Sequence, residues 1–453
     1  MAVLSGIQDH LDEIAVIGGG IIGVTLAYRL ARSGRHVCLI DPDAPEAAAS
    51  FGTAGHLATD QIAPMASKAT LKLGLDMLLS GTSTQPTPIS INPIYIPRLL
   101  PWLARFVWAS RPLAYVQGRN ALVALQKAAL TAWLDLMALL PEDLAQDLKI
   151  ETRGHLELYS DPLAYDHVLR ALPALSGFGV KARPVLDARL AEIRASVGVS
   201  IIGAIDVEST GFVPDPAKLM QSFREAATRL GVNFIRARVD DLHQDGAGGY
   251  CLHLDGGEPL SQGRLKVRAE QVVLAAGVGS AALMRSLGCP VPLDTERGYH
   301  LTLPGWWPSA PDGSRLCPMV YQEARVFLSP LASGTRITGF VELAGMQKPS
   351  DPRKFEALRR TLLSLWPEAP VATAREWMGF RPSLPDHLPM IGTVPNHPRI
   401  LAAFGHHHLG LTLAAITADT IDRLIEGRQP LVPLAAFGVD RFQMRMLWRG
   451  VRL

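Results

Sequence analysis

The most regular hydrophobic pattern in the chain lies near its start, where a short apolar run leads through glycines into a helical pattern. Residues 14–17 are all apolar, as in a buried parallel strand. Between Leu26 and Ala31 the apolar residues recur at helical spacing, and Gly34 marks the helix end. A second apolar run at 36–40 predicts another strand. The pattern therefore predicts a β-α-β unit.

Patterns of the same two kinds continue along the chain. Residues 214–230 read as a helix that begins near Asp215, and residues 232–239 read as the strand after it. Alternation of polar and apolar residues predicts further strands at the ranges 154–159, 297–302, 326–329 and 337–342. The apolar run 271–277 predicts a buried strand, and residues 411–426 an apolar helix. We expect an α/β protein that also contains an antiparallel sheet.

The glycines of the first unit indicate a nucleotide. Gly18, Gly20 and Gly23 have the G-x-G-x-x-G spacing that lets a backbone turn sharply and approach a pyrophosphate at a helix N-terminus. Asp41 ends the second strand, 23 residues after Gly18, near the offset of an acid that binds an adenosine ribose. The alternative is an ordinary β-α-β unit in which Asp41 caps the turn before Pro42.

Composition limits the class of protein. Of 453 residues 48% are hydrophobic and 19% charged, so the chain is globular, with room for two or three domains. A net charge of +2 gives no electrostatic reason to expect nucleic acid. The four cysteines are far apart, and the N-terminus lacks the pattern of a secretory signal, so we expect a reducing, cytoplasmic location. The apolar run 121–140 is broken by polar residues, as in a helix packed against protein.

Four segments together resemble one known family. Residues 50–56 are similar to the Ser-Phe-Ala-Asn-Ala-Gly segment of bacterial D-amino acid dehydrogenases, flavoproteins of the D-amino acid oxidase superfamily, with Thr53 in place of asparagine and His56 in place of glutamine. Residues 297–302 resemble a Lys-Gly-Tyr-Ser-Leu-Thr strand of that family. Residues 377–392 resemble its Gly-Leu-Arg-Pro-x-x-Pro-Asp-x-x-Pro-x-x-Gly motif, and residues 405–412 its Gly-His-Gly-x-x-Gly turn.

The resemblance implies a Rossmann-like FAD-binding domain interleaved with an α+β substrate domain built on an antiparallel sheet. The FAD-binding domain would comprise residues 1–60, 212–290 and 378–435. The substrate domain would comprise 61–211 and 291–377, and residues 436–453 would form a C-terminal tail.

The family also implies which residues hold the flavin. Residues 50–56 would run under the flavin, backbone near Val239 would meet the adenine, and the turn at 405–412 would aim a helix N-terminus at the flavin pyrimidine. The flavin residues implied are Gly18, Gly20, Ile21, Ile22, Gly23, Asp41, Ser50, Ala54, Gly55, His56, Val239, Ala276, Gly277, Gly405, His406, Leu409, Gly410, Leu411 and Thr412.

The same resemblance implies substrate residues. The guanidinium of Arg381 would hold the substrate carboxylate bidentately, and the phenol of Tyr299 would face the substrate. The alternatives are a surface ion pair of Arg381 with Asp386 and a structural role for Tyr299. His56, His407 and His408 are candidates for a catalytic base. The alternative for His56 is a loop histidine bonded to the backbone. The adjacent histidines 406–408 point in divergent directions and have no cysteine or carboxylate beside them, so no metal is expected.

The implied reaction is FAD-dependent dehydrogenation of a D-amino acid, by hydride transfer from Cα to flavin N5. D-Proline and hydroxy-D-proline are candidate substrates, and a quinone or another component of an electron-transfer chain is the expected acceptor. Three alternatives stay open: an oxidase of sarcosine or other N-methyl amino acids, a 2-hydroxy acid dehydrogenase, and a flavin-binding subunit of a larger complex. The basic, aromatic tail 440–452 and the proline-rich segment 85–102, which reads as a long apolar loop, are candidates for peripheral contact with the inner face of the cytoplasmic membrane. The alternative for both is packing on the protein's own body, and segment 85–102 is also a candidate lid or partner surface.

Overall fold

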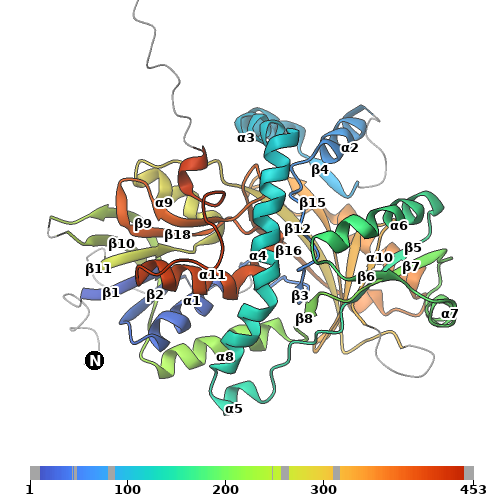
Figure 1. Ribbon diagram of the computed structural model, residues 1–453, viewed down its shortest axis with the longest axis horizontal. Helices are drawn as coiled ribbons and strands as arrows, with labels where there is room; N and C mark the ends of the chain where they lie inside the picture. Colours follow the sequence, from blue (N-terminus) through green and yellow to red (C-terminus); the bar gives the residue numbers. More distant parts are fainter. Residues whose placement is uncertain are drawn as a thin grey trace, which may run out of the picture.

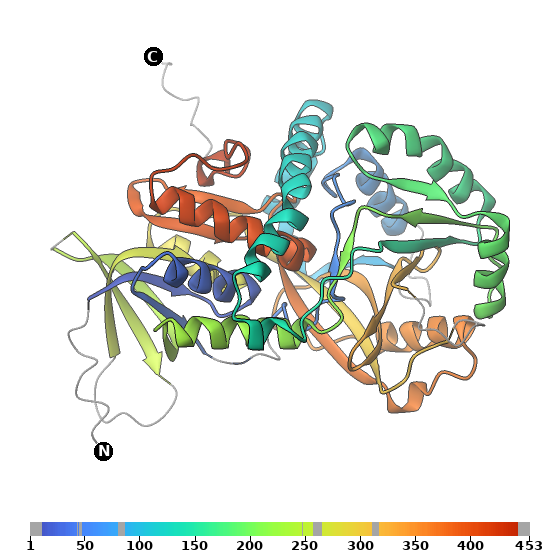
Figure 2. The ribbon, with the colours of Figure 1, turned by 60° about the horizontal axis from the view of Figure 1, so that its bottom comes forward.

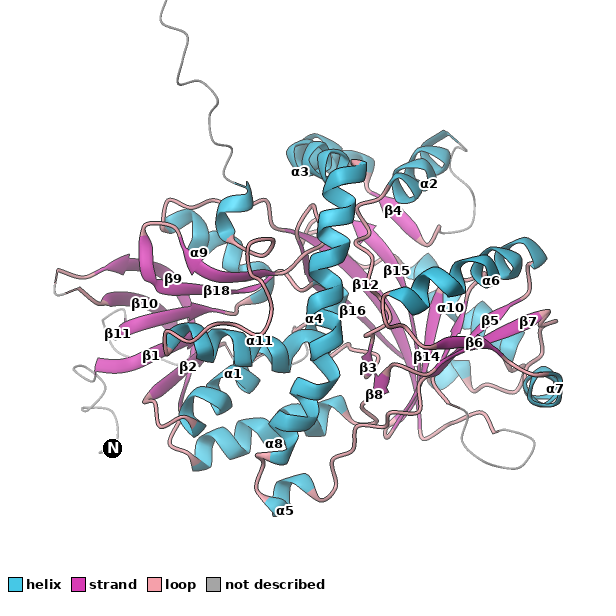
Figure 3. Ribbon diagram, in the orientation of Figure 1, coloured by secondary structure: helices cyan, strands magenta, loops and turns pink. Residues whose placement is uncertain are grey.

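Two large β-sheets lie on either side of one long helix, α4 (Pro112–Ala138), as Figures 1 and 2 show. The computed structural model describes residues 11–42, 44, 48–79, 87–246, 248–256, 265–309 and 317–442. Strands and helices alternate along much of the described chain, which confirms the predicted α/β class (Figure 3).

The first sheet combines a parallel ladder with an antiparallel hairpin. β2 (Val37–Asp41), β1 (Leu11–Ile17), β11 (Leu265–Leu274) and β18 (His397–Phe404) are parallel neighbours in that order. β9 (Asn233–Gln244) starts parallel to β2 and then pairs antiparallel with β10 (Tyr250–Gly256), which pairs with the first half of β11. β17 (Met390–Val394) adds an antiparallel strand beside β18.

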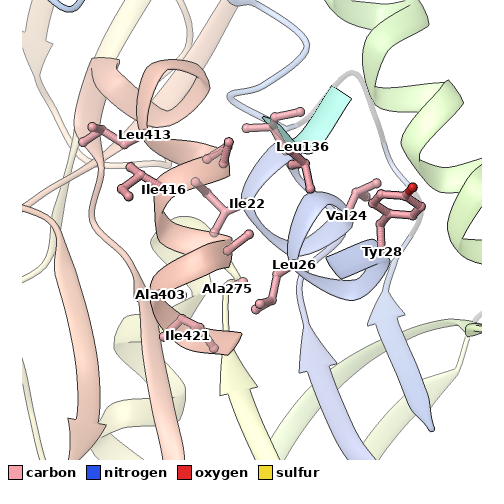
Figure 4. Close-up of a cluster of buried hydrophobic side chains, with 14 of the residues drawn as sticks. Ile22, Val24, Leu26, Tyr28, Leu136, Ala275, Ala403, Leu413, Ile416 and Ile421 are labelled. Atoms are coloured by element: carbon pink, nitrogen blue, oxygen red, sulfur yellow. The ribbon is translucent and has the colours of Figure 1, made fainter. Parts of the chain in front are cut away.

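Alternating side chains give this sheet two buried faces. Ile14 and Val16 point to the side covered by α1 (Ile21–Arg32), α8 (Pro216–Arg229) and α11 (Gly410–Ile425), where α1 and α11 lie side by side (Figure 4). Ala15 and Ile17 point to the opposite side, which α9 (Ser280–Ser286) covers. This two-faced burial explains why residues 14–17 are continuously apolar.

The second sheet is mainly antiparallel, as predicted. Its order is β16 (Arg375–Ser383), β12 (Asp294–Pro304), β15 (Gly334–Leu343), β14 (Val326–Leu331), β13 (Met319–Tyr321), β5 (His155–Tyr159), β7 (Gly203–Val207) and β6 (Ala182–Pro184). β4 (Ile89–Ile91) joins the edge of β15, and both β15–β4 and β13–β5 are parallel pairs. One face packs against α10 (Pro352–Leu365) and α7 (Asp187–Ser196).

The opposite face of the second sheet is turned toward the segment after β2. That segment contains β3 (His56–Leu57), which pairs with β8 (Gly211–Phe212). β16 runs through the expected domain boundary at 378, so residues 378–383 belong to the second sheet and not to the first.

The proline-rich segment is more regular than a loop. Within the described part of 85–102, β4 is followed by a short turn at Pro93–Tyr95 and by α3 (Ile96–Ala109). Pro97 stands in the first turn of α3, where a missing N–H costs nothing. The remaining described helices are α2 (Lys68–Leu79), α5 (Glu142–Ala145) and α6 (Pro162–Gly177).

Among the described residues, one helix, α4, is long and apolar enough to cross a membrane by length and composition alone. Its contacts show that it packs within the protein. The buried Trp133 donates its indole N–H to the carbonyl of Leu411 at 2.8 Å, and Gln126 donates to the carbonyl of Ala58 at 3.0 Å. These polar contacts join α4 to α11 and to the β3 segment.

Candidate active site

The predicted cofactor residues meet at one edge of the first sheet. β1, β2, β11 and β18 are parallel, so their carboxyl ends lie together. Gly18 follows β1, Asp41 ends β2, Ala276 and Gly277 follow β11, and Gly405 follows β18. Val239 lies on β9, three residues beyond the partner of Asp41, with its side chain in the core behind the sheet.

Two of the glycines are required by close backbone contacts. Gly18 has a φ of +111°, and a Cβ there would lie 2.5 Å from the carbonyl oxygen of Ala275. A Cβ at Gly23 would lie 1.8 Å from the carbonyl oxygen of Gly18. Helix α1 can therefore approach β1 only without these side chains, as the glycine motif predicts.

The loop before α1 presents its N–H groups to polar side chains. The N–H of Gly19 donates to Oδ2 of Asp41 at 2.6 Å, and the N–H of Ile21 donates to Oγ of Ser50 at 3.0 Å. Ile21 and Ile22 are buried in the first turn of α1. Asp41 and Ser50, predicted from separate motifs, thus meet the same glycine loop.

The second predicted anion site is the start of α11. Its N-cap residue, Leu409, provides no side-chain hydrogen bond, so the first N–H groups of Gly410 and Leu411 are not capped by a side chain of the described residues. Thr412 instead accepts a hydrogen bond from the N–H of Ala58 at 3.0 Å. His406 is buried, and its Nε2 shares a hydrogen bond of 3.0 Å with Oγ1 of Thr417. It lies within the turn that precedes α11.

These features fit FAD. The glycine loop and the N-terminus of α1 suit the pyrophosphate, Asp41 suits a ribose, and the uncapped start of α11 suits the negative charge of a reduced flavin. The fit rests on the close approach of α1 to β1 that the glycines permit and on the donors at both helix starts.

The second sheet holds the 50–56 segment through backbone carbonyls. The buried guanidinium of Arg336 donates to the carbonyls of Thr53 at 2.6 Å and Phe51 at 3.2 Å, and Oγ of Ser329 donates to the carbonyl of Ala54 at 2.6 Å. Burial lowers the pKa of Arg336 to about 10. Val213 donates to the carbonyl of Gly55 at 2.7 Å, which fixes the end of the segment.

Two aromatic side chains press on the same segment. The ring of His300 lies 3.3 Å from the carbonyl of Gly52 and stacks on Trp377 at 4.8 Å between centroids. A Cβ at Gly52 would lie 1.9 Å from Trp377, so only glycine fits there. Burial, together with the nearby Arg336, lowers the pKa of His300 to about 2 and keeps its ring neutral.

Arg381 lies on this face of the second sheet, close to the turn before α11. A Cβ at Gly298 would lie 2.2 Å from its Nη2, so the guanidinium rests over the bare backbone of β12. Nη1 donates to the carbonyl of Phe340 at 3.1 Å. Two residues further on, Ser383 forms a bridge with His406. The alternative of an ion pair with Asp386 is wrong, because Asp386 pairs with Arg441 at 2.8 Å.

A buried histidine–carboxylate contact that the sequence analysis missed lies behind Arg381. Nε2 of His387 is 3.0 Å from Oε1 of Glu296, and both side chains are almost wholly buried. Burial disfavours the Glu296 carboxylate, but His387, His407 and Arg381 outweigh it and lower the pKa of Glu296 to about 2. Glu296 therefore places a permanent negative charge near the Arg381 guanidinium.

The prediction that Tyr299 faces the substrate is not supported by its position. Tyr299 and His300 are successive residues of β12 and so point to opposite faces of the sheet. His300 faces Gly52, whereas the Tyr299 ring packs against Phe355 of α10 and its hydroxyl donates to Glu342 over 2.5 Å. Tyr299 is fully buried in that core, in agreement with the structural alternative.

His56 belongs to a cluster with two residues that were not predicted. Its Nε2 is 3.5 Å from Oδ1 of Asp60, and its ring contacts those of His155 and Phe327 at 4.7 and 4.5 Å between centroids. Burial, reinforced by the nearby His56, lowers the pKa of His155 to about 4. Burial alone would raise the pKa of Asp60, but the neighbouring His56 and His155 lower it, so the carboxylate is ionised.

Of the three histidines predicted as bases, only His56 keeps a ring nitrogen without a partner among the described residues, Nδ1. His407 has Nδ1 3.0 Å from Nδ1 of His408 and Nε2 2.6 Å from the carbonyl of His387. His408 in turn contacts Gln61 through Nε2. Burial lowers the pKa of His407 to about 3. His407 and His408 are therefore bound into the wall of the site.

Several of these contacts had only weak signals in the sequence. Arg336 and Thr302 are polar residues in or beside segments where polar and apolar residues alternate. Nothing in the sequence shows that the two strands are neighbours. Their side chains meet at 3.0 Å in the structure. Asp60, His155, Glu296 and His387 stand beside or near other polar residues in the sequence, and no motif of their own distinguishes them.

Comparisons with known proteins agree with this arrangement. The family described as DAO, FAD dependent oxidoreductase, matches residues 13–424. The chain is 30% identical over 441 residues to a D-amino-acid oxidase of Bradyrhizobium diazoefficiens, covering 95% of this chain and 99% of that one. It is also 30% identical over 442 residues to a D-amino acid dehydrogenase of Methylobacterium sp., again over 95% and 99% of the two chains.

A solved structure shares the fold. Glycine oxidase from Geobacillus kaustophilus superposes with a TM-score of 0.68 at 20% identity, over 96% of this chain and 99% of that one. With the family match over nearly the whole described chain and the nucleotide cradle at the carboxyl edge of its first sheet, this protein belongs to the DAO family of FAD-dependent oxidoreductases.

Proposed function

We propose that this protein dehydrogenates a D-amino acid. The observation that carries the proposal is the half-buried guanidinium of Arg381, on the sheet face that holds the 50–56 segment and next to the turn before α11. The two relatives at 30% identity, named for oxidation of D-amino acids, support the substrate class. FAD, when bound, supplies the two-electron oxidising power.

Arg381 is the residue that would bind the substrate carboxylate. Its Nη1 is engaged by the carbonyl of Phe340, which leaves other donors of the guanidinium for a ligand. Glu296 limits the cost of burying this cation, while its own carboxylate is held by His387. Once the amino group and the side chain are positioned as well, a fixed carboxylate allows the Cα–H bond of only one enantiomer to face the flavin.

His56 is the proposed acceptor of a proton from the substrate ammonium. Its Nδ1 is unpartnered among the described residues, and the ionised Asp60 lies beside its Nε2. A carboxylate at one nitrogen of an imidazole stabilises the charge that the other nitrogen acquires. Loss of that proton and of a hydride from Cα gives an imino acid, which water hydrolyses to a keto acid and ammonia.

The first test is anaerobic mixing of the flavin-loaded protein with matched D- and L-amino acids, D-proline, hydroxy-D-proline, sarcosine and 2-hydroxy acids. Bleaching of the flavin by D-enantiomers is expected. Bleaching only by sarcosine would support the N-methyl amino acid oxidase, and bleaching only by hydroxy acids the 2-hydroxy acid dehydrogenase. No bleaching by any compound would overturn the proposal in favour of a flavin-binding subunit.

The electron acceptor is proposed to be a membrane quinone, and one surface supports contact with a membrane. Exposed apolar side chains cluster on the turn before α3, on α3 and on the start of α4; they are Ile94, Leu100, Val107, Trp108, Leu113 and Val116. From residue 77 to residue 134 the sequence has five basic residues and no acidic one. Such a surface suits the anionic inner face of the cytoplasmic membrane. The tail after residue 442, also predicted to touch a membrane, lies outside the described residues.

Cosedimentation with vesicles tests this contact. The protein should bind phosphatidylglycerol vesicles more strongly than phosphatidylcholine vesicles, and the double variant Trp108→Ser, Leu113→Ser should lose most of that binding. Leu163→Ser and Leu186→Ser remove equally exposed leucines elsewhere and serve as the matched control. Equal binding of both double variants would show that this surface is not the contact.

A further inference from the structure

The hairpin of β9 and β10 carries four potential metal ligands on one open face. His243 stands directly opposite Cys251, and Asp241 directly opposite His253, in the antiparallel register. Side chains directly opposite each other share a face of the sheet. The intervening Leu242 and Leu252 point to the other face and are buried in the core. The four polar side chains therefore form a square on one face of the hairpin. The strands β9 and β10 lie at the edge of the molecule that is turned away from the second sheet (Figure 1).

The ligand atoms of this square are close together. Sγ of Cys251 lies 3.9 Å from Nε2 of His253, and the rings of His243 and His253 are 5.0 Å apart between centroids. One ligand atom each of His243, Cys251 and His253 lie within 4.8 Å of one another. Oδ2 of Asp241 is 3.5 Å from Nδ1 of His243.

We propose that these side chains form a zinc site, with His243, Cys251 and His253 as ligands and Asp241 or water in the fourth position. Zinc binds thiolate at about 2.3 Å and imidazole at about 2.0 Å in a tetrahedron, so bound ligand atoms are roughly 3.3–3.8 Å apart. The observed separations exceed this range by about 1 Å or less, which rotation of side chains on the partly exposed surface closes.

The chemical nature of the ligands selects the metal. A thiolate and two imidazoles suit zinc and other thiophilic divalent ions, and not magnesium or calcium, which take oxygen ligands. A thiolate and a carboxylate together also balance the two charges of the ion. The neighbouring strand β11 opposes binding with Lys266 and Arg268, the register partners of His253 and Cys251, although Arg268 is paired with Asp245 at 2.7 Å.

The second cluster of potential ligands, His56, Asp60 and His155, lies in the candidate active site, and so the experiment must separate the two. The zinc site has no part in the proposed oxidation. Its expected effect is to clamp β9 to β10, since a metal that binds only the folded state stabilises it.

Cobalt is the probe, because tetrahedral Co2+ with a thiolate ligand absorbs strongly at longer wavelengths than oxidised flavin. The full-length, flavin-loaded protein should take up one equivalent of Co2+ with such a band, and Zn2+ should abolish it by displacement. Cys251→Ser and His253→Ala should each remove the band and weaken Zn2+ binding at least about 10-fold, measured by calorimetry.

Two controls make the result specific. Cys317→Ser and His167→Ala change a cysteine and an exposed histidine outside the square and should leave the band unchanged, and circular dichroism should confirm that all variants are folded. A weak, octahedral Co2+ spectrum in the unmodified protein would overturn the proposal. So would a strong band that survives in the Cys251→Ser, His253→Ala double variant and disappears in His56→Asn.

Discussion

At the scale of single residues, the site depends on charges that are buried in pairs. Arg381 approaches the bare backbone of Gly298 and lies within the field of Glu296, whose own partner is His387. Removing one member of such a set leaves the others without compensation, which costs more than the net value of the pair. Substitutions here should therefore change substrate binding and stability together, and conservative variants are the informative ones.

Replacing Arg381 with lysine keeps the charge but removes the planar fork that binds a carboxylate. We expect a loss of about 1.5–3 kcal/mol in substrate binding, which raises KM roughly 10- to 100-fold. Steady-state kinetics with the best D-amino acid measures it. Arg375→Lys, an exposed position of the same strand, is the matched control. An unchanged KM in Arg381→Lys would show that Arg381 does not hold the carboxylate.

Asp41 should matter for the cofactor and not for the substrate. Its carboxylate holds the glycine loop through Gly19 and stands where a ribose is expected, so Asp41→Ala should weaken FAD binding roughly 10- to 100-fold. Reconstitution of the apoprotein, followed by flavin fluorescence, measures the affinity. Asp135→Ala, on an exposed position of α4, should change nothing. If both variants bind FAD equally well, Asp41 has only a local capping role.

At the scale of elements, the contacts of α4 decide how the two halves hold together. Trp133 is fully buried, and its indole N–H is hydrogen-bonded to Leu411 in the first turn of α11. The helix thus supports the same turn whose N–H groups are expected to face the flavin. A substitution in α4 should therefore change the affinity for FAD, although no residue of α4 was predicted to contact the cofactor.

Trp133→Phe tests this support. The variant leaves the carbonyl of Leu411 without its indole donor and should lower the free energy of unfolding by about 1–3 kcal/mol, measured with urea. FAD affinity should fall with it. Trp108→Phe, at an exposed position of α3, is the matched control and should leave both quantities unchanged. Wild-type stability in Trp133→Phe would mean that the indole N–H contributes nothing.

The elements also show what a sequence can and cannot reveal. The glycine loop and Asp41 were predicted from a spacing that reflects local backbone geometry, whereas Ser50 and the turn at 405–412 were predicted from the resemblance to a known family. Tyr299 was expected to face the substrate but packs against α10, because alternation along β12 predicts two faces without saying which of them is turned to the ligand. Arg336, Glu296 and His387 were missed because their partners are set by strand order, which joins residues up to 285 positions apart.

At the scale of the whole molecule, buried neutral histidines make stability depend on pH. Burial is the main cause in each case; it lowers the pKa of His155 to about 4, of His300 to about 2, and of His406 and His407 to about 3. Their ordinary value is 6.5. Below pH 6.5 the unfolded chain therefore binds protons that the folded chain does not, and stability is lost as the pH falls.

Urea unfolding of the flavin-loaded protein at a series of pH values checks this. The free energy of unfolding should be constant near pH 7.5 and should decline between about pH 6.5 and 4, by up to about 1.4 kcal/mol per pH unit for each imidazole. In His300→Gln the free energy of unfolding should decline less steeply with falling pH, by the contribution of one imidazole, about 1.4 kcal/mol per pH unit. A free energy of unfolding that does not change between pH 7.5 and 5 would contradict the assignment of neutral buried rings.

The pairing of α1 with α11 and of β1 with β11 and β18 has a consequence for how the protein is made. The first strand and helix leave the ribosome early, but the strands and the helix that bury their apolar faces come from the last two-fifths of the chain. The nucleotide cradle cannot close until α11 has been synthesised. During translation these apolar faces must be covered by a chaperone or by temporary contacts until their partners have been made. A chain that ends before α11 should therefore not retain its flavin.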